Sequence, residues 1–191
     1  MRNAQGTRIR LERASLRHAA AFVEAVQRSR KLHARWVSPP ASLEAFQDYL
    51  QSKRGASHVS YFVVAEPEQL VGVININEIV RGLFQSAYIG YYAFAPHHGR
   101  GYMSLGLAAV VRRAFREHRL HRLEVSIQPA NRASIALATR VGFRREGFSP
   151  RYLKIGGRWR DHERWAMTVE DWKHAQRAAG QTRRADQRKR S

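Results

Sequence analysis

Cysteine is absent from the 191 residues of this chain, which excludes disulfide bonds, thiolate metal sites and a cysteine nucleophile. The chain also lacks any apolar run of the roughly 18 residues that a helix needs to cross a bilayer. The first seven residues are polar and basic, and no apolar stretch follows them, so no secretory signal is expected. Together these absences predict a cytoplasmic protein with no membrane partner.

Acidic residues are scarce. The chain carries 34 Lys and Arg against 15 Asp and Glu, a net charge of +19, and residues 177–191 contribute +5 of it. A field of this sign attracts nucleic acid, the ribosome, acidic proteins or a phosphate-rich cofactor. An arginine-rich surface without any such partner explains the same total. Contact with the ribosome or RNA through the basic surface is therefore one of two open interpretations.

The residues that are present indicate a packed domain. Apolar residues make up 43% of the chain, and four Trp, seven Tyr and eight Phe supply anchors that a disordered chain lacks. The length suits one domain. Because the apolar pattern ends after Trp172, we expect a single domain over residues 1–175 and a basic, disordered tail over residues 176–191.

The apolar spacing predicts the order strand, two helices, three strands, helix, strand, helix and two strands. In this prediction residues 60–95 form an antiparallel meander, and residues 143–168 form a final hairpin. The chain therefore belongs to the mixed α/β class. The expected helix N-caps are Ser15, Ser42 and Asn131, and the expected helix stop is Gly142.

A glycine-bearing turn follows the third strand of the meander and leads into a helix. The N-terminus of a helix exposes unpaired backbone N–H groups and a partial positive charge, and Gly99 and Gly101 let the backbone approach a ligand closely. Arg100 adds charge and Ser104 adds a hydroxyl. The spacing matches neither the P-loop nor the dinucleotide-binding fingerprint. We interpret the turn as a phosphate site, with an ordinary glycine-rich connection as the alternative.

The turn from His98 to Met103 resembles the motif Q/R-x-x-G-x-G/A of the GNAT acetyltransferases. His98 replaces the usual Gln or Arg, and Met103 replaces the usual Gly or Ala; both departures are familiar in the RimJ/RimL branch, which acetylates ribosomal protein N-termini. Other segments similar to this family occur in order between Arg8 and Trp172. They are Arg81-Gly82-Leu83-Phe84, Tyr88-Ile89-Gly90-Tyr91, Asn131-Arg132-Ala133-Ser134, Val141-Gly142-Phe143, Glu146-Gly147-Phe148 and Trp159-Arg160-Asp161-His162.

The resemblance implies a fold and a cofactor. The implied fold is the GNAT α/β (α+β) fold, a mostly antiparallel sheet of about seven strands flanked by helices and splayed between strands four and five. Acetyl-CoA would lie in the splay, with its pyrophosphate on the turn and its pantetheine arm along the fourth strand. The implied cofactor-binding residues are Ala93, Phe94, His98, Gly99, Arg100, Gly101, Tyr102, Met103, Ser104 and Asn131.

The resemblance leaves the catalytic groups open. Ala138 stands where many members have a tyrosine acid, so Ser134 is the nearest group to protonate the departing thiolate; a helix-start hydroxyl that bonds backbone is the alternative. Arg151 stands where some relatives have a glutamate base. Glu78 lies on a strand where other members keep a carboxylate, and a solvated strand residue is equally consistent. Histidines with suitable pKa values are His97, His98 and His162.

The pKa values of different amines narrow the choice of acceptor substrate. An N-terminal α-amine has an ordinary pKa of about 7.8 and a lysine of about 10.4, so the α-amine is far more often neutral at pH 7. A site without a strong base therefore favours the N-terminal α-amine of a protein, such as a ribosomal protein. A small-molecule amine is the first alternative, and an RNA- or ribosome-associated binding protein with a secondary or lost acetyltransferase site is the second. No metal cluster is expected, and monomer and homodimer both remain open.

Overall fold

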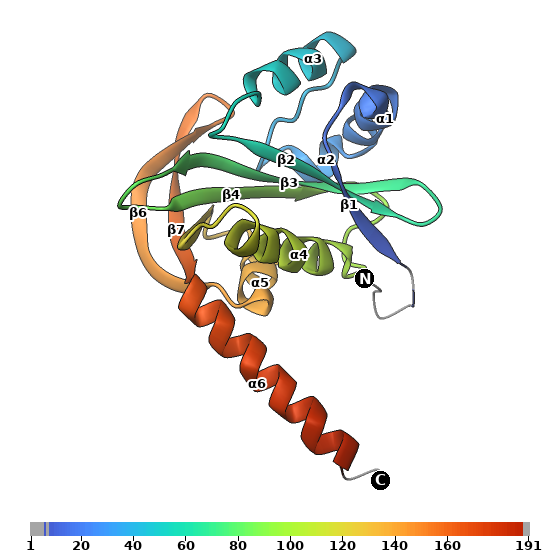
Figure 1. The fold of residues 1–191 in the computed structure, drawn as a ribbon. Coiled ribbons are helices and arrows are strands. Elements are labelled where there is room, and N and C mark those ends of the chain that lie inside the picture. The colour runs from blue at the N-terminus through green and yellow to red at the C-terminus, as the bar shows by residue number, and fades with distance from the viewer. Residues whose placement is uncertain (1–5, 7, 189–191) are drawn as a thin grey trace.

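The computed structural model describes Gly6 and residues 8–188, with side chains as far as residue 181 (Figure 1). Its strands form one seven-stranded sheet in the order β1-β2-β3-β4-β5-β7-β6. The β4–β5 pair is parallel, and the other five neighbouring pairs are antiparallel. This is the mixed, mostly antiparallel sheet that was expected. The strands are β1 Ile9–Arg13, β2 Val59–Ala65, β3 Gln69–Val80, β4 Ser86–Ala93, β5 Arg122–Ile127, β6 Arg144–Ile155 and β7 Arg158–Thr168.

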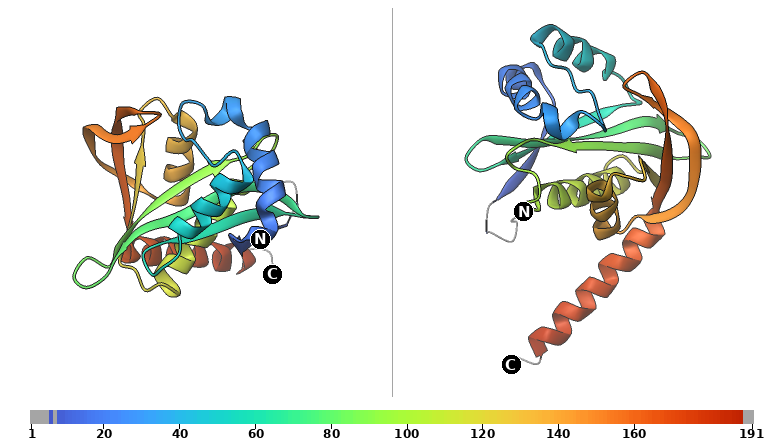
Figure 2. Two further views of the ribbon diagram at one scale, coloured as in Figure 1. Left: turned by 90° about the horizontal axis from the view of Figure 1, so that it is seen from above. Right: turned by 180° about the vertical axis from the view of Figure 1, so that it is seen from behind.

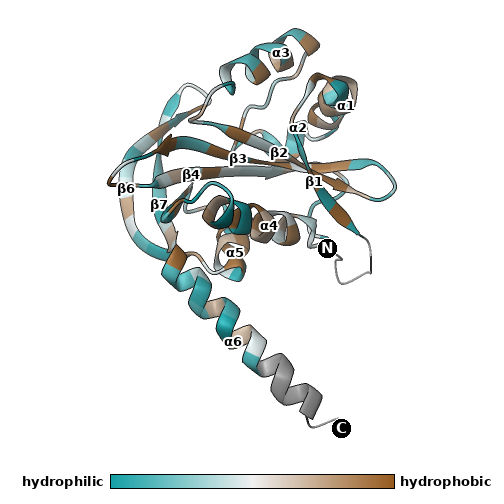
Figure 3. Cartoon of the chain, viewed as in Figure 1, coloured by the Kyte–Doolittle hydropathy of each residue, from teal (hydrophilic) through white to brown (hydrophobic). Residues whose placement is uncertain are grey.

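Helices cover both faces of the sheet. α1, α2 and α3 lie on one face, α4 and α5 on the other, and α6 projects away from the sheet on the α4 side (Figures 1 and 2). The predicted meander is β2-β3-β4. β2 is buried along its whole length and β3 from Leu70 to Ile76, because helices cover both faces of the sheet there; Figure 3 shows the hydropathy of the residues. The helices are α1 Ala19–Arg28, α2 Arg30–His33, α3 Leu43–Ser52, α4 Tyr102–Arg116, α5 Arg132–Val141 and α6 Val169–Arg188, with a 3-10 turn at Leu16–His18.

Alternation along the strands divides the buried residues into two cores. Ile74 of β3 faces α4 and packs in a core that includes Leu107, whereas Val73 faces α1 and packs near Phe22. α4 lies close against the sheet because Gly106 has no side chain; a Cβ there would lie 2.7 Å from Cγ2 of Val63. Gly106 thus lets α4 pack closely on β2 and β3.

The structure confirms three of the four predicted helix caps and stops. The Ser42 hydroxyl accepts a hydrogen bond from Ala45 N at 3.1 Å, and Gly142 ends α5 with φ of 106°. Asn131 Oδ1 accepts from Ser134 N at 3.1 Å. The prediction for Ser15 was wrong: its hydroxyl lies 3.2 Å from Nδ1 of His18 and makes no capping bond, because the chain first forms a 3-10 turn there.

The sheet is splayed between β4 and β5, as expected. The two strands pair only where residues 86–88 meet residues 122–124. Beyond that point β4 continues to Ala93 and β5 to Ile127 without pairing to each other, while β5 stays paired with β7 along its length. A gap therefore opens between the carboxyl ends of two parallel strands.

The segment predicted to be a disordered tail is helical as far as Arg188, and residues 189–191 lie outside the described residues. α6 begins with a capping box, in which Thr168 N donates to Asp171 Oδ2 at 3.2 Å and Asp171 N donates to Thr168 Oγ1 at 3.3 Å. Alanine, arginine and glutamine continue the helix because they are good helix formers, although the segment has no apolar periodicity. Across the described part of the chain, no helix is long and apolar enough to cross a membrane.

Candidate active site

The gap between β4 and β5 opens into a cavity of about 700 Å³. Its wall combines both faces of the sheet, since it includes the turn before α4 and the start of α5 as well as α2 from the opposite layer. β3, β5 and the β6–β7 hairpin complete the lining. A cavity of this size at a splayed pair of parallel strands can hold an extended ligand between the strand edges.

The turn before α4 presents its backbone to this cavity. Gly99 and Gly101 have φ of 77° and 79°, the left-handed region that favours glycine, and a Cβ at either position would meet nothing within 4 Å. Gly101 is the N-cap of α4, so the amides of Tyr102, Met103 and Ser104 have no partner within the helix. An anion placed there receives hydrogen bonds and the favourable end of the helix dipole.

The side chains of Arg100 and Met103, two residues of the predicted turn, point to places other than the expected phosphate site. Arg100 is exposed and does not line the cavity. The Met103 side chain packs against β3 at Gly72, where an added Cβ would lie 2.3 Å from Sδ. Gly72 thus makes room for the methionine that replaces the usual Gly or Ala, and the departure from the motif leaves the Met103 amide in place.

The edge of β4 offers one of the two predicted backbone sites. Phe94 N donates to Val71 O at 2.9 Å, and Phe94 O accepts from His97 N at 2.9 Å, so both main-chain groups of Phe94 are already used. Phe94 is fully buried and does not line the cavity. Ala93 has the opposite orientation because backbone groups alternate along an antiparallel strand, and it faces the gap.

His33 of α2, which sequence reasoning missed, holds this edge. Its Nε2 donates to Ala93 O at 2.8 Å, and its Nδ1 is buried without a partner among the described residues. Burial lowers the pKa of His33 and so favours the neutral ring, and the hydrogen bond to the Ala93 carbonyl partly offsets this effect. No local signal marks this residue, because the bond joins positions 60 apart in the sequence.

α5 carries Asn131 and Ser134 to the far side of the gap. Asn131 Oδ1 caps the helix, which leaves Nδ2 for a ligand. Tyr91 OH donates to Ser134 O at 3.0 Å, and burial raises the pKa of Tyr91, so this neutral phenol ties α5 to β4. Ser134 itself lines the cavity.

Glu78 lies outside the cavity. A bulge between Asn77 and Val80 turns it outward, its side chain is 69% exposed, and Oε1 lies 4.0 Å from Nε2 of His58. The polar residues that β3 does contribute are Asn75 and Asn77. Asn75 Oδ1 accepts from Tyr49 OH at 2.8 Å, which leaves its amide nitrogen as a donor.

Two histidines of the sequence motifs reach the cavity with different surroundings. His98 lies on the exposed turn, whereas His162 of β7 is 3% exposed. Nδ1 of His162 donates to Arg160 O at 2.9 Å, since a carbonyl can only accept. Burial lowers the pKa of His162, partly offset by that carbonyl and by Asp161. The ring is therefore neutral at pH 7 with its lone pair on Nε2.

The lining is nearly free of charge. None of the described residues that line the cavity is Asp or Glu, and Arg140 is its one arginine. Among the described residues, no group of three His, Asp or Glu could hold a metal ion. The site therefore combines the backbone donors of the turn with neutral polar side chains and apolar residues such as Trp36 and Leu137.

Comparison with known proteins identifies the class. The acetyltransferase (GNAT) domain family matches residues 8–144, so the chain belongs to this family. Among solved structures, Mycobacterium smegmatis RimJ in complex with CoA-disulfide is similar with a TM-score of 0.79 and 27% identity, covering 85% of this chain and 83% of that one.

Two curated relatives are similar in sequence. The ribosomal protein uS5-alanine N-acetyltransferase of Escherichia coli (strain K12) is 38% identical over 114 residues, which cover 59% of each chain. The Bacillus subtilis (strain 168) protein named "Probable N-acetyltransferase YjcK" is 35% identical over 114 residues, covering 60% of this chain and 62% of that one. The chain thus spans about three fifths of the length of these curated relatives.

Proposed function

We propose that this protein transfers the acetyl group of acetyl-CoA to the N-terminal α-amine of a protein, with a ribosomal protein as the acceptor. The observation that carries the proposal is the splayed β4–β5 gap with the open glycine turn of α4 at one end. The RimJ structure with a CoA-disulfide has the same fold, and the Escherichia coli relative is named for its ribosomal substrate.

The residues present fit acetyl-CoA. The amides from Gly99 to Ser104 would hold its pyrophosphate, because the turn is open and the first turn of α4 has unpaired N–H groups. The gap-facing N–H of Ala93 would bond the pantetheine arm, because the Ala93 carbonyl already accepts from His33, and Asn131 Nδ2 would reach the arm from α5. Phe94 and the Arg100 side chain are left out of this set, because neither lines the cavity.

Catalysis then requires orientation and a path for protons. The cofactor supplies a thioester, whose carbonyl carbon an amine can attack. Ser134 is the proposed donor to the departing sulfur, because it is a hydroxyl-bearing residue that lines the cavity on the α5 side. Glu78 is not part of the proposal, since its exposed carboxylate lies outside the cavity.

The neutral lining supports an α-amine acceptor. Amines that arrive as cations, such as polyamines or a lysine side chain, are held by carboxylates, and none of the described lining residues is acidic. An α-amine, with a pKa of about 7.8, gives up its proton more readily. The site therefore suits a protein N-terminus better than a cationic small molecule.

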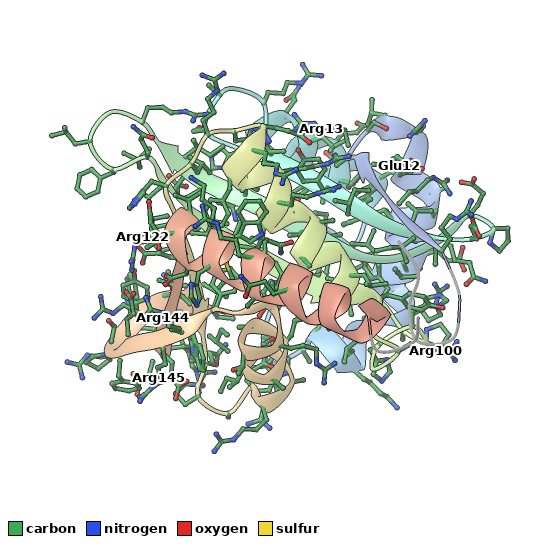
Figure 4. All side chains as sticks on the ribbon, turned by 60° about the horizontal axis from the view of Figure 1, so that its bottom comes forward. Glu12, Arg13, Arg100, Arg122, Arg144 and Arg145 are labelled. Carbon is green, nitrogen blue, oxygen red and sulfur yellow. The ribbon has the colours of Figure 1, made fainter. Side chains whose placement is uncertain are left out.

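The basic surface supports approach of a large, acidic substrate. In Figure 4, Arg122, Arg144 and Arg145 lie on one side of the α4–α6 face and Arg100 lies at the opposite end. Arg144 pairs with Asp171 at 3.0 Å, and Arg145 lies 3.4 Å from Glu163. The positive charge is thus spread and partly paired, which favours steering of ribosomal material over a defined RNA site.

A panel of acceptors tests the proposal. Peptides with a free N-terminal Ala or Ser, the same peptides with a blocked N-terminus and an internal lysine, and spermidine are each incubated with enzyme and acetyl-CoA. We expect acetylation of the free N-termini alone, located by mass spectrometry. Preferred turnover of spermidine would support a small-molecule acetyltransferase instead. Salt-sensitive RNA binding without turnover on any acceptor would support a binding protein.

A further inference from the structure

We propose that His162 accepts the proton of the acceptor amine, an inference that rests on the proposed acetyl transfer. The main-chain carbonyl of Arg160 fixes its tautomer, because Nδ1 donates to that oxygen at 2.9 Å. Nε2 therefore carries the lone pair. His162 lines the cavity, and within the described part of the chain no hydrogen bond occupies Nε2.

The other histidines of the cavity are less suited to this role. Nδ1 of His33 and Nδ1 of His97 are both sealed from solvent without a partner, so no ligand in the cavity can reach them. Nε2 of His162 is not sealed in this way, although the residue as a whole is buried. His98 belongs to the exposed turn at the phosphate end. His162 alone among these four combines a tautomer fixed by a main-chain carbonyl with a second ring nitrogen that is not sealed from the cavity.

The face of the sheet on which His162 lies agrees with a role toward the acceptor. Trp165 and Met167 of β7 pack in the core on the α4 side. Side chains alternate along a strand, so His162, three positions before Trp165, faces the α1–α3 side. Tyr92 of β4 faces that side too, because it pairs in register with Val73 of the α1 core.

Ser134 approaches the same gap from the other face. It lies in the first turn of α5, which is on the α4 side of the sheet (Figures 1 and 2). A proton acceptor and a proton donor therefore stand on opposite faces of the gap. This arrangement suits an addition in which the amine enters from one side and the sulfur leaves toward the other.

The amine nitrogen bonds to the thioester carbonyl carbon while its proton passes to Nε2 of His162, and the carbon–sulfur bond then breaks. The thiolate takes a proton from the Ser134 hydroxyl, which water restores, and His162 returns its proton to solvent. The products are the acetylated amine and CoA. No oxidant, reductant or metal takes part in this sequence.

The test uses the full chain, acetyl-CoA and the preferred N-terminal peptide. We expect His162→Ala to lower kcat by about 10²-fold, with unchanged acetyl-CoA affinity by calorimetry. Free imidazoles of similar size but different pKa should restore turnover, and the restored rate should rise with the pKa of the imidazole. A purely structural histidine would give rescue that follows size or no rescue, and either result would overturn the inference.

A second variant guards against misfolding. His162→Asn keeps a side-chain donor for the Arg160 carbonyl but offers no basic nitrogen, so it should be as slow as His162→Ala. Activity near wild type in either folded variant would overturn the inference while leaving the proposed function intact. His118→Ala, which removes a partly buried histidine outside the cavity, should keep its activity and ignore imidazole. Wild-type enzyme that acetylates no peptide would overturn the inference and the proposed function together.

Discussion

The turn before α4 and the β6–β7 hairpin meet at one cavity, but they contribute to it in different ways. The turn offers backbone amides from a single run of residues, and its side chains matter little: Arg100 does not line the cavity and Met103 packs against Gly72. The hairpin contributes the side chain of His162, whose tautomer depends on one main-chain bond. If the proposed assignment holds, the cofactor side depends on backbone conformation, and the acceptor side depends on individual functional groups.

The largest expected effect comes from a substitution in the backbone turn that is proposed to bind the cofactor. Gly101→Glu places an anion at the N-terminus of α4, where the pyrophosphate is expected, and forces a side chain into the left-handed region, which costs about 1–2 kcal/mol. We expect calorimetry on the folded variant to show no acetyl-CoA binding.

Gly82→Glu is the matched control. Gly82 also has a positive φ, of 68°, and open space around it, but it does not line the cavity. This variant carries the same charge and a similar strain, so its acetyl-CoA affinity should equal that of wild type. Unchanged affinity in Gly101→Glu would contradict the assignment of the turn.

The next effect tests the side-chain chemistry of the gap. Ser134→Ala removes the proposed donor to sulfur but keeps the helix cap, because the cap uses the Ser134 amide and Asn131 Oδ1. We expect kcat to fall by about 10²-fold with acetyl-CoA affinity nearly unchanged. Glu78→Gln, which alters a carboxylate outside the cavity, should keep wild-type kinetics. Steady-state kinetics on the N-terminal peptide distinguish the two, and a wild-type kcat in Ser134→Ala would make Ser134 structural.

The same division explains what could be predicted from the sequence. The turn, the Asn131 cap and the Gly142 stop depend on neighbours within a few residues, and the structure confirms both helix signals. His33 acts through Ala93, 60 residues away, and no local pattern reveals such a bond. Phe94 was assigned by resemblance, and the hydrogen bonds of its main chain to Val71 and His97 could be read only from the folded sheet.

α6 shows where apolar periodicity is not a sufficient signal. The loss of an apolar period after Trp172 was interpreted as disorder, but period reports burial, whereas helix formation in an exposed segment depends on propensity and capping. The capping box of Thr168 and Asp171 was present in the sequence and marks the start of the helix. The division into a domain at residues 1–175 and an appended segment at 176–191 stays a prediction.

The smallest expected effect concerns residues 176–191. It distinguishes long-range electrostatic attraction of the substrate from direct contact between this segment and the domain. Deleting residues 177–191 removes +5 of the net charge of +19. The start of α6 should remain, because the Trp172 ring packs 5.7 Å from that of Phe115 and the Asp171–Arg144 pair is kept. We expect unchanged acetyl-CoA binding and thermal stability, and a kcat/KM on ribosomal substrate that falls by up to about tenfold at low salt.

Salt and substrate size show whether this loss arises from the field. The difference between intact and shortened enzyme should shrink as ionic strength rises, because the Debye length falls from about 30 Å at 0.01 M to about 8 Å at 0.15 M. A short peptide is too small to gain from a distant charge, so its kcat/KM should not change on deletion. Equal loss on peptide and ribosomal substrate would mean that the segment packs on the domain near the site. No loss on either at low salt would show that its charge does not serve substrate capture.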